Sequence, residues 1–235
     1  YDEVHRRLMS TYRSLYLSYS NYHASIGNNK KAVEILDMMN EMISPKQFPM
    51  ELEIAHRLLS MYEQFGAGES ALKYADIFLD QAMMLVDNPD IRKDLTYYEL
   101  ADRNIGPHRM ASQVHKLKGE YNKAIELLEK LKGKVSQTLA SVRGSQYKRE
   151  EQMLMQNLID VEGNILLLKL EKAYDEGGME GAQAEATRML AELNQSNEPQ
   201  SRMLAGYVSQ FMRKLEFENS PADTISELST ENQSQ

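Results

Sequence analysis

The sequence contains no cysteine and no tryptophan. Without cysteine the chain can form neither a disulfide nor a thiolate metal site, and its redox compartment stays open. Its longest apolar runs, at 82–86 and 165–168, are far shorter than the ~20 residues that cross a bilayer. Stretches rich in Val, Ile and Thr at a period of two are also missing, so the sequence predicts no β-sheet.

The sequence also has no excess of basic residues. The 27 basic and 35 acidic residues give a formal net charge of -8. A nucleic-acid interface needs a clustered basic face that displaces counterions, and anionic lipid attracts the same kind of face. We therefore expect no nucleic-acid partner and no direct docking on a membrane surface.

What the sequence does contain is a repeated glycine-to-alanine spacing. Four times a glycine is followed five residues later by an alanine, where one amphipathic stretch ends and another begins: Gly27/Ala32, Gly66/Ala71, Gly119/Ala124 and Gly177/Ala182. Glycine accepts the left-handed backbone of a tight turn between helices. Alanine lets two crossing helices approach closely. The recurrence predicts an all-α chain of stacked antiparallel helical hairpins.

Periodicity and turn residues place the expected helices along the chain. The expected ranges are 2–26, 32–43, 52–65, 71–86, 90–104, 110–117, 121–135, 146–174, 182–193 and 199–217. We expect Gly106-Pro107 to break the chain after the fifth of these. Residues 1–217 are predicted to form one helical repeat domain whose last helix caps the stack. The polar tail 218–235 is predicted to be disordered.

The first expected helix carries most of the candidate binding residues. One of its faces holds Leu8, Tyr12, Leu15, Tyr16, Tyr19, His23 and Ile26. The tyrosines of this helix, Tyr12, Tyr16, Tyr19 and Tyr22, have two interpretations. They fill gaps between helices, which repeat cores commonly require and which we favour, or they offer hydroxyls in a groove that grips an extended peptide or glycan.

No residue set predicts catalysis, a cofactor or a metal. His108 and His115 lie seven residues apart on one helical face, whereas a zinc site usually draws on a pair three or four apart and needs three or four converging ligands. No nucleophile elbow, phosphate loop or triad spacing occurs. We therefore expect packing or surface histidines and no enzymatic activity in this chain.

The glycine-to-alanine spacing, with large residues at helix-facing points such as Leu36, Met39, Leu128 and Leu131, resembles the tetratricopeptide repeat. The sequence departs from that motif in two ways. Its glycines are 39, 53 and 58 residues apart rather than 34, and the aromatic residue near the start of the first helix is kept only as Tyr16. The resemblance implies a degenerate, tetratricopeptide-like solenoid.

A second resemblance covers residues 4–130. The stretch "YRSLYLSYSNYHASIGNNKKAVEILDMMNEMISPKQFPME", with "SALKYADIF" and "DLTYYEL", is similar to the soluble C-terminal part of a bacterial family of multi-pass membrane proteins of unknown function. The membrane part of that family resembles lipid-linked-sugar mannosyltransferases of the GT-C type. The resemblance implies membrane spans before Tyr1 and places the catalytic carboxylates outside this chain.

These observations lead to a set of functional expectations. We expect a non-enzymatic interaction or scaffolding domain whose partner is a protein segment or its own membrane domain. The parent protein would lie in the bacterial inner membrane, with this domain in the aqueous phase, and a transferase-like topology would place it in the periplasm. The alternative is a carbohydrate-binding or carbohydrate-processing domain that uses exposed tyrosines and carboxylates.

Overall fold

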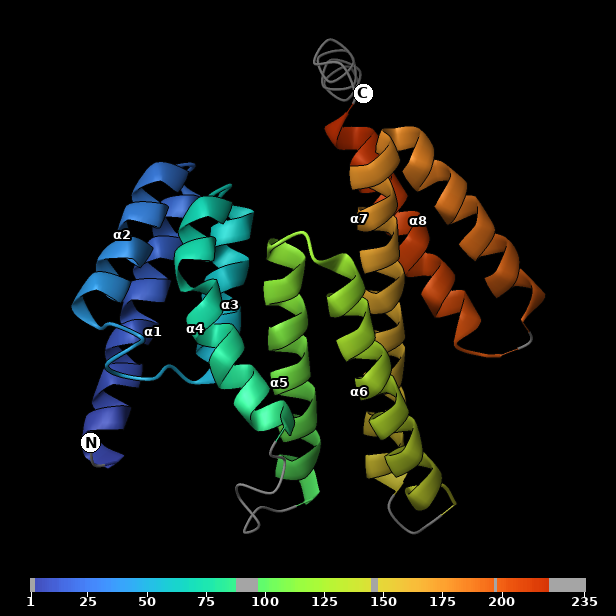
Figure 1. Cartoon of the computed structure of the whole chain (residues 1–235), viewed down its shortest axis with the longest axis horizontal. Helices are drawn as coiled ribbons and strands as arrows, with labels where there is room; N and C mark the ends of the chain where they lie inside the picture. The colour runs from blue at the N-terminus through green and yellow to red at the C-terminus, as the bar shows by residue number, and fades with distance from the viewer. Residues whose placement is uncertain (1–2, 88–96, 145–147, 197, 220–235) are drawn as a thin grey trace, which may run out of the picture. The chain divides into compact units, whose positions relative to one another are not determined.

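A computed structural model describes residues 3–87, 97–144, 148–196 and 198–219. Over these ranges the chain is all-helical, as the sequence predicts, and contains no strand. The helices, shown in Figure 1, are α1 (Glu3–Ser25), α2 (Asn29–Met42), α3 (Leu52–Gln64), α4 (Gly68–Asp87), α5 (Tyr97–Leu117), α6 (Tyr121–Val142), α7 (Lys148–Gln195) and α8 (Ser201–Glu218). The chain divides into two compact units, Tyr1–Leu131 and Lys132–Gln235.

Three of the four expected glycine turns have the same backbone geometry. Gly27, Gly66 and Gly119 adopt φ of 77°, 74° and 72°. In each turn, the residue after the glycine donates its N–H to the carbonyl four positions before the glycine, at 2.9 Å from Asn28, 2.8 Å from Ala67 and 2.8 Å from Glu120. These bonds satisfy carbonyls at the end of the preceding helix. The prediction that glycine ends α1, α3 and α5 is confirmed.

The alanines of the four pairs are all completely buried: Ala32, Ala71, Ala124 and Ala182. Two of the hairpins each contain an equivalent hydrogen bond from a serine. Ser20 Oγ donates to the carbonyl of Ala32 at 2.8 Å, and Ser112 Oγ donates to the carbonyl of Ala124 at 3.1 Å. Each serine lies seven residues before its glycine, so α1–α2 and α5–α6 repeat the same local construction.

The first unit has one continuous hydrophobic core drawn from α1 to α6. Its largest fully buried members include Leu17, Leu36, Leu58, Tyr62 and Phe78. Tyr62 also donates its hydroxyl to Asp37 Oδ1 at 2.7 Å and accepts a hydrogen bond from Asn40 Nδ2 at 3.1 Å. This polar contact links α2 to α3 inside the core.

The expected break at Gly106-Pro107 is wrong, because α5 runs unbroken from Tyr97 to Leu117 with Pro107 inside it. Proline removes one helical hydrogen bond and usually ends or kinks a helix. Here Ile105, Pro107 and Met110 are buried, and Met110 belongs to the core of the first unit. Burial against neighbouring helices outweighs the local cost.

In the second unit, the fourth expected turn lies one residue late. Gly178, rather than Gly177, takes positive φ, with φ 61° and ψ -151°, and bends α7 into two arms. A Cβ at Gly181 would lie 2.4 Å from the carbonyl oxygen of Ala173, so the returning arm passes too close for any side chain there. The arms pack with α8 around a small core of Leu170, Ala186, Met189 and Val208.

Some expectations lie outside the described residues. These are the segment 90–96 of the expected fifth helix, the start at Gln146 of the expected long helix, and most of the tail predicted to be disordered, residues 220–235.

Candidate functional site

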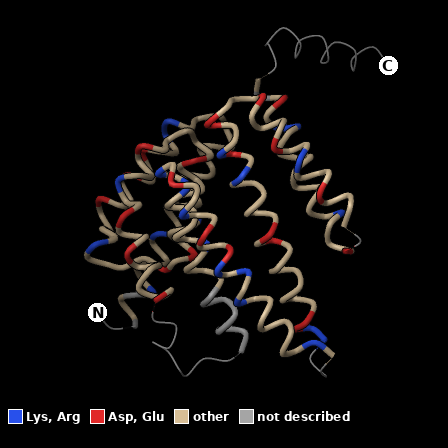
Figure 2. The backbone as a smooth tube through the Cα atoms, turned by 45° about the vertical axis from the view of Figure 1, so that its right-hand side comes forward, with Lys and Arg blue, Asp and Glu red and all other residues tan. Residues whose placement is uncertain are grey.

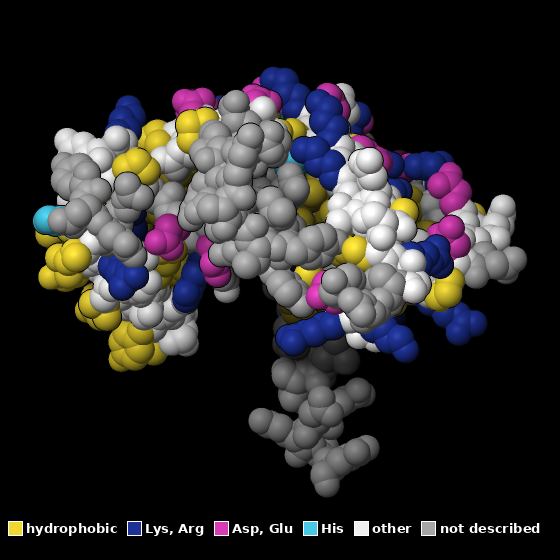
Figure 3. All heavy atoms as spheres, turned by 90° about the horizontal axis from the view of Figure 1, so that it is seen from below, with side chains coloured by type: hydrophobic (Ala, Val, Ile, Leu, Met, Phe, Trp, Pro, Cys, Tyr) yellow, Lys and Arg dark blue, Asp and Glu magenta, His cyan; other side chains and the backbone are white. Residues whose placement is uncertain are grey.

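Helix α1 has two contrasting faces. The buried face carries Arg13, Leu17 and Ser20, whose side chains are 3%, 1% and 0% exposed. The opposite face carries large side chains that are 45–72% exposed: Val4, Leu8, Tyr12, Leu15, Tyr19, Tyr22 and, just past the end of the helix, Ile26. We call these seven residues the α1 stripe. In Figure 3, hydrophobic side chains gather on the left-hand edge of the molecule, where Figure 1 places α1 and α2.

This arrangement corrects the expected packing of the first helix. The favoured interpretation of the tyrosines as core fillers is wrong for Tyr12, Tyr19 and Tyr22, which are 46%, 54% and 57% exposed. It holds better for Tyr16, which packs against the core and directs its hydroxyl to Met42 Sδ at 3.1 Å. The helix can bury a polar face because Ser20 and Arg13 both find acceptors inside the molecule.

The spacing of the stripe is regular. From Leu8 to Ile26 its members are alternately four and three residues apart, at positions 8, 12, 15, 19, 22 and 26. This is the heptad spacing that lets one helix pack along another with side chains interlocked. An exposed face with this period is a surface suited to a second helix.

From Leu8 onward, the helix that carries the stripe has little charge. Arg13, which is buried, is the one Lys, Arg, Asp or Glu residue between Leu8 and Asn29. Along the helices elsewhere, acidic and basic residues are interspersed (Figure 2). Interfaces are depleted in charge and enriched in tyrosine relative to ordinary surface. The α1 stripe therefore has the composition of an interface core rather than of a solvated helix.

Three hydroxyl groups beside the stripe donate to carbonyls of their own helix. Thr11 Oγ1 donates to the carbonyl of Arg7 at 2.9 Å, Ser18 Oγ to that of Ser14 at 2.9 Å, and Ser25 Oγ to that of Tyr22 at 2.8 Å. Such bonds to the preceding turn satisfy the hydroxyl within its own helix. The flank of the stripe is thereby left with few outward-pointing donors.

The four tyrosines of α1 lie in two different positions around the helix. Three lie on the stripe, and Tyr16 lies beside it with Met42, which is 68% exposed. The hydroxyls of Tyr12, Tyr19 and Tyr22 form no hydrogen bond with any residue that the structure describes. His23 packs edge-on between two of these rings, with centroids 4.7 Å from Tyr19 and 5.4 Å from Tyr22.

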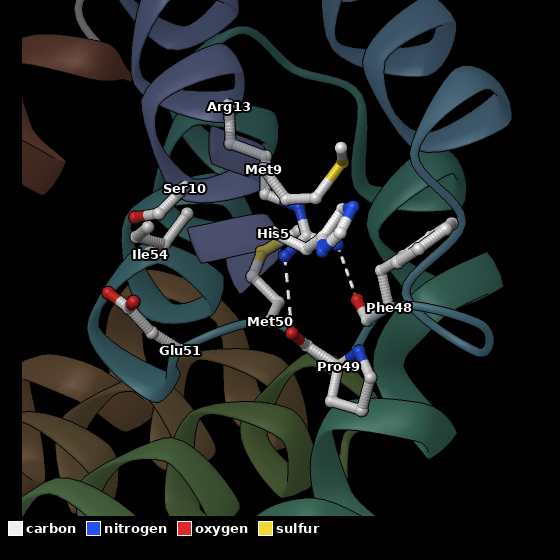
Figure 4. Close-up of a pocket in the computed structure, with 9 residues that line it drawn as sticks. All are labelled: His5, Met9, Ser10, Arg13, Phe48, Pro49, Met50, Glu51 and Ile54. Atoms are coloured by element: carbon white, nitrogen blue, oxygen red, sulfur yellow. Dashed lines mark hydrogen bonds between the residues drawn. The ribbon is translucent and has the colours of Figure 1, made fainter. Parts of the chain in front are cut away.

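A pocket of about 420 Å³ lies on the other side of α1 (Figure 4). It is lined by His5, Met9, Ser10, Arg13, Phe48, Pro49, Met50, Glu51 and Ile54. Arg13 reaches across it to the segment that joins α2 to α3. Its Nη1 donates to the carbonyl of Pro49 at 3.2 Å, and its Nη2 donates to the carbonyls of Ile43, at 3.4 Å, and Phe48.

The charge of Arg13 is held without an ion pair. Among the described residues no carboxylate lies within salt-bridge distance of it, and burial lowers its pKa, an effect that the negative charge of Glu51 partly offsets. Three carbonyl acceptors take the place of a carboxylate. The arrangement fastens the α2–α3 segment to α1, so we assign Arg13 a structural role.

Two histidines of α5 have different surroundings. His115 Nδ1 lies 2.6 Å from Glu120 Oε2, and Lys123 Nζ donates to Glu120 Oε1 at 2.8 Å. His108 is buried. Over the described ranges, no three His, Asp or Glu side chains converge as metal ligands would.

Sequence reasoning missed the buried polar residues of α1. Arg13 and Ser20 interrupt the apolar pattern, so a search for hydrophobic periodicity assigns their face to solvent. A signal was nonetheless present. Ser20 and Ser112 occupy the same place relative to Gly27 and Gly119, which marks a repeated internal contact.

Comparison with known proteins adds no identification, since neither the family models nor the curated proteins match this sequence. In the part of the chain that the structure describes, none of the helices combines the length and the apolarity that crossing a membrane requires. The site geometry therefore carries the functional argument.

Proposed function

We propose that this chain is a non-enzymatic protein-interaction domain that binds a partner helix along the α1 stripe. The single observation that carries the proposal is the exposed apolar face of α1, whose six members from Leu8 to Ile26 have heptad spacing in a stretch where the one charged residue, Arg13, is buried on the opposite face. A domain exposing so continuous an apolar row usually covers it with a partner. Tyrosine supplies contact area at low cost in side-chain entropy and tolerates solvent while the partner is absent.

The hairpins support a degenerate tetratricopeptide-like arrangement for the scaffold. The supporting features are the shared turn geometry at Gly27, Gly66 and Gly119, the buried alanines, and the serine bonds that α1–α2 and α5–α6 have in common. In such proteins the hairpins supply rigid helices on which binding residues are displayed.

We further propose that the domain is the aqueous part of a membrane-anchored protein, on the strength of the sequence resemblance over residues 4–130. Fractionation of cells that express the native gene tests this. The native protein should sediment with membranes and resist extraction by high salt. Recovery of the full-length product in the soluble fraction contradicts the placement.

The interaction itself is tested by nuclear magnetic resonance titration of the isotope-labelled chain. The probes are a three-heptad peptide with leucine at the interlocking positions and, separately, a manno-oligosaccharide. The peptide should shift amide signals from α1, and the oligosaccharide should not. Shifts with the sugar alone would favour the carbohydrate-binding alternative and overturn the proposal.

Matched variants connect the binding to the stripe. Leu15→Glu places a charge at its centre and should abolish the peptide shifts. Leu72→Glu makes the same change on α4, where the side chain is 43% exposed, and should leave the shifts intact. If both variants lose the peptide-induced shifts to the same extent, binding does not depend on α1.

A further inference from the structure

We infer that the helix that covers the α1 stripe is α1 of a second copy of this chain, packed antiparallel to the first. The inference rests on the proposed function, because it names the partner of the same face. It is carried by the symmetry of the stripe, the dipoles of the two helices and the area of the stripe.

The α1 stripe is self-complementary when one copy is reversed. An antiparallel alignment centred on Leu15 pairs Val4 of one copy with Ile26 of the other and Leu8 with Tyr22. It brings the two Leu15 side chains together at the two-fold axis and lays Tyr12 beside Tyr19. Every layer then joins two apolar or aromatic side chains, as an interface related by two-fold symmetry requires.

The helix dipoles favour this direction. In the antiparallel arrangement, the positive N-terminal end of each α1 lies beside the negative C-terminal end of the other. The two acidic and two basic residues that begin the chain, Asp2, Glu3, Arg6 and Arg7, balance in formal charge. A parallel arrangement would instead bring like dipole ends together.

The area is sufficient for a specific dimer. At 23 residues and 1.5 Å per residue, α1 is about 34 Å long. With roughly 200 Å² for a large side chain and the exposed fractions of 45–72%, the stripe offers on the order of 700 Å² per copy. Interfaces of standard size bury about 800 Å² per partner. Met42, exposed beside Tyr16, adds to this surface.

The first test is the mass of the chain in solution, measured by sedimentation and light scattering from low to high micromolar concentration. We expect a reversible transition from the mass of one chain, 27.0 kDa, to twice that mass. Leu15→Glu should weaken dimerisation by roughly a hundredfold or more, because each copy brings a carboxylate to the axis. Leu72→Glu should leave it unchanged. Leu15→Gln provides a milder variant if the charged one fails to fold, which far-ultraviolet circular dichroism would show.

Oxidative cross-linking then tests the direction, and the absence of native cysteine makes single substitutions unambiguous. Leu15→Cys should form a disulfide-linked dimer. Leu8→Cys should not, because the two copies of position 8 would be separated by about 21 Å along the axis. Combining Leu8→Cys with Tyr22→Cys should restore the cross-link. Efficient linking by Leu8→Cys alone contradicts the antiparallel arrangement.

The two proposals fail in different ways. A chain that stays monomeric at all concentrations, yet binds the heptad peptide through α1, overturns the dimer and leaves the proposed function standing. A dimer that forms equally well with Leu15→Glu uses another surface and also overturns the inference. A chain that neither dimerises nor binds the peptide contradicts both proposals.

Discussion

Arg13 links α1 to the segment between α2 and α3 through hydrogen bonds to three backbone carbonyls. Its side chain is almost fully buried, so water cannot readily replace these bonds. The carbonyls it satisfies lie at the two ends of this connection, whereas the backbone N–H groups of Gln47 and Phe48 within it donate to the carbonyl of Ser44. A single side chain therefore sets the position of a whole connection.

Replacing Arg13 with methionine tests that role. The variant Arg13→Met keeps much of the apolar stem but leaves the carbonyls of Ile43, Phe48 and Pro49 without their donor. We expect a loss of about 1–3 kcal/mol in the free energy of unfolding, measured by urea denaturation. The control Arg57→Met alters an exposed arginine on α3 and should change stability by less than ~0.5 kcal/mol. Similar effects in the two variants would contradict the assigned role.

Glu120 provides a pH-dependent test at the turn between α5 and α6. Hydrogen bonds from Lys123 and then from His115 lower the pKa of Glu120 from 4.5 to about 2. A carboxyl group whose pKa is lower in the folded state stabilises the fold above its unfolded pKa, and this contribution disappears as the pH falls toward the folded pKa. We expect Glu120→Gln to be less stable than the native chain at pH 7, with the gap closing between pH 4.5 and 2.

Urea denaturation of both chains across this pH range measures the gap. Glu129→Gln, a change at an exposed position of α6, serves as the control. A gap that stays constant from pH 7 to pH 2 would show that the carboxylate at position 120 gains nothing from its two partners.

At the scale of elements, the turns follow from the sequence because their backbone requirement is specific. Only glycine adopts φ near 75° without strain, so Gly27, Gly66 and Gly119 identify where helices end. The alanines that follow were also predicted correctly, since close helix crossings need small side chains. The glycine turns and the buried alanines are therefore determined almost entirely by the residues at those positions.

Other elements could not be predicted locally. Pro107 is a helix breaker by itself, yet α5 continues through it because its neighbours are buried. Helix α1 carries an apolar stripe on one side and a mixed face containing Arg13 and Ser20 on the other. Periodicity identifies the stripe, but which face is buried depends on acceptors supplied by Ala32 and the α2–α3 segment. The sequence therefore identifies the residues of the candidate site, but the favoured interpretation of its tyrosines places them in the core.

A pair of glycine substitutions tests the turn argument. Gly66→Ala places a side chain at φ +74° and should destabilise the fold by roughly 1–2 kcal/mol. Gly133→Ala makes the same change inside α6, where no atom lies within 4 Å of the added Cβ. It should stabilise by about 0.5–1 kcal/mol. Thermal unfolding compares the two, and opposite signs are expected. Stabilisation by both would show that the left-handed conformation at Gly66 is not required.

At the scale of the whole molecule, the chain keeps a net charge of -8 while leaving one helix face without charge. General repulsion between acidic surfaces discourages nonspecific association. A local uncharged stripe with heptad spacing permits one specific contact despite that repulsion. The combination is the basis for proposing an interaction domain.

The central claim is that the α1 stripe contributes to binding and not to the fold. The most direct measurement compares these two quantities in one double variant, Leu15→Gln with Tyr19→Gln, at the lowest concentration that circular dichroism allows. We predict a change of less than ~0.5 kcal/mol in the free energy of unfolding, because both side chains are exposed, and at least a tenfold loss of affinity for the heptad peptide. A loss of several kcal/mol in stability with unchanged peptide affinity would contradict the account.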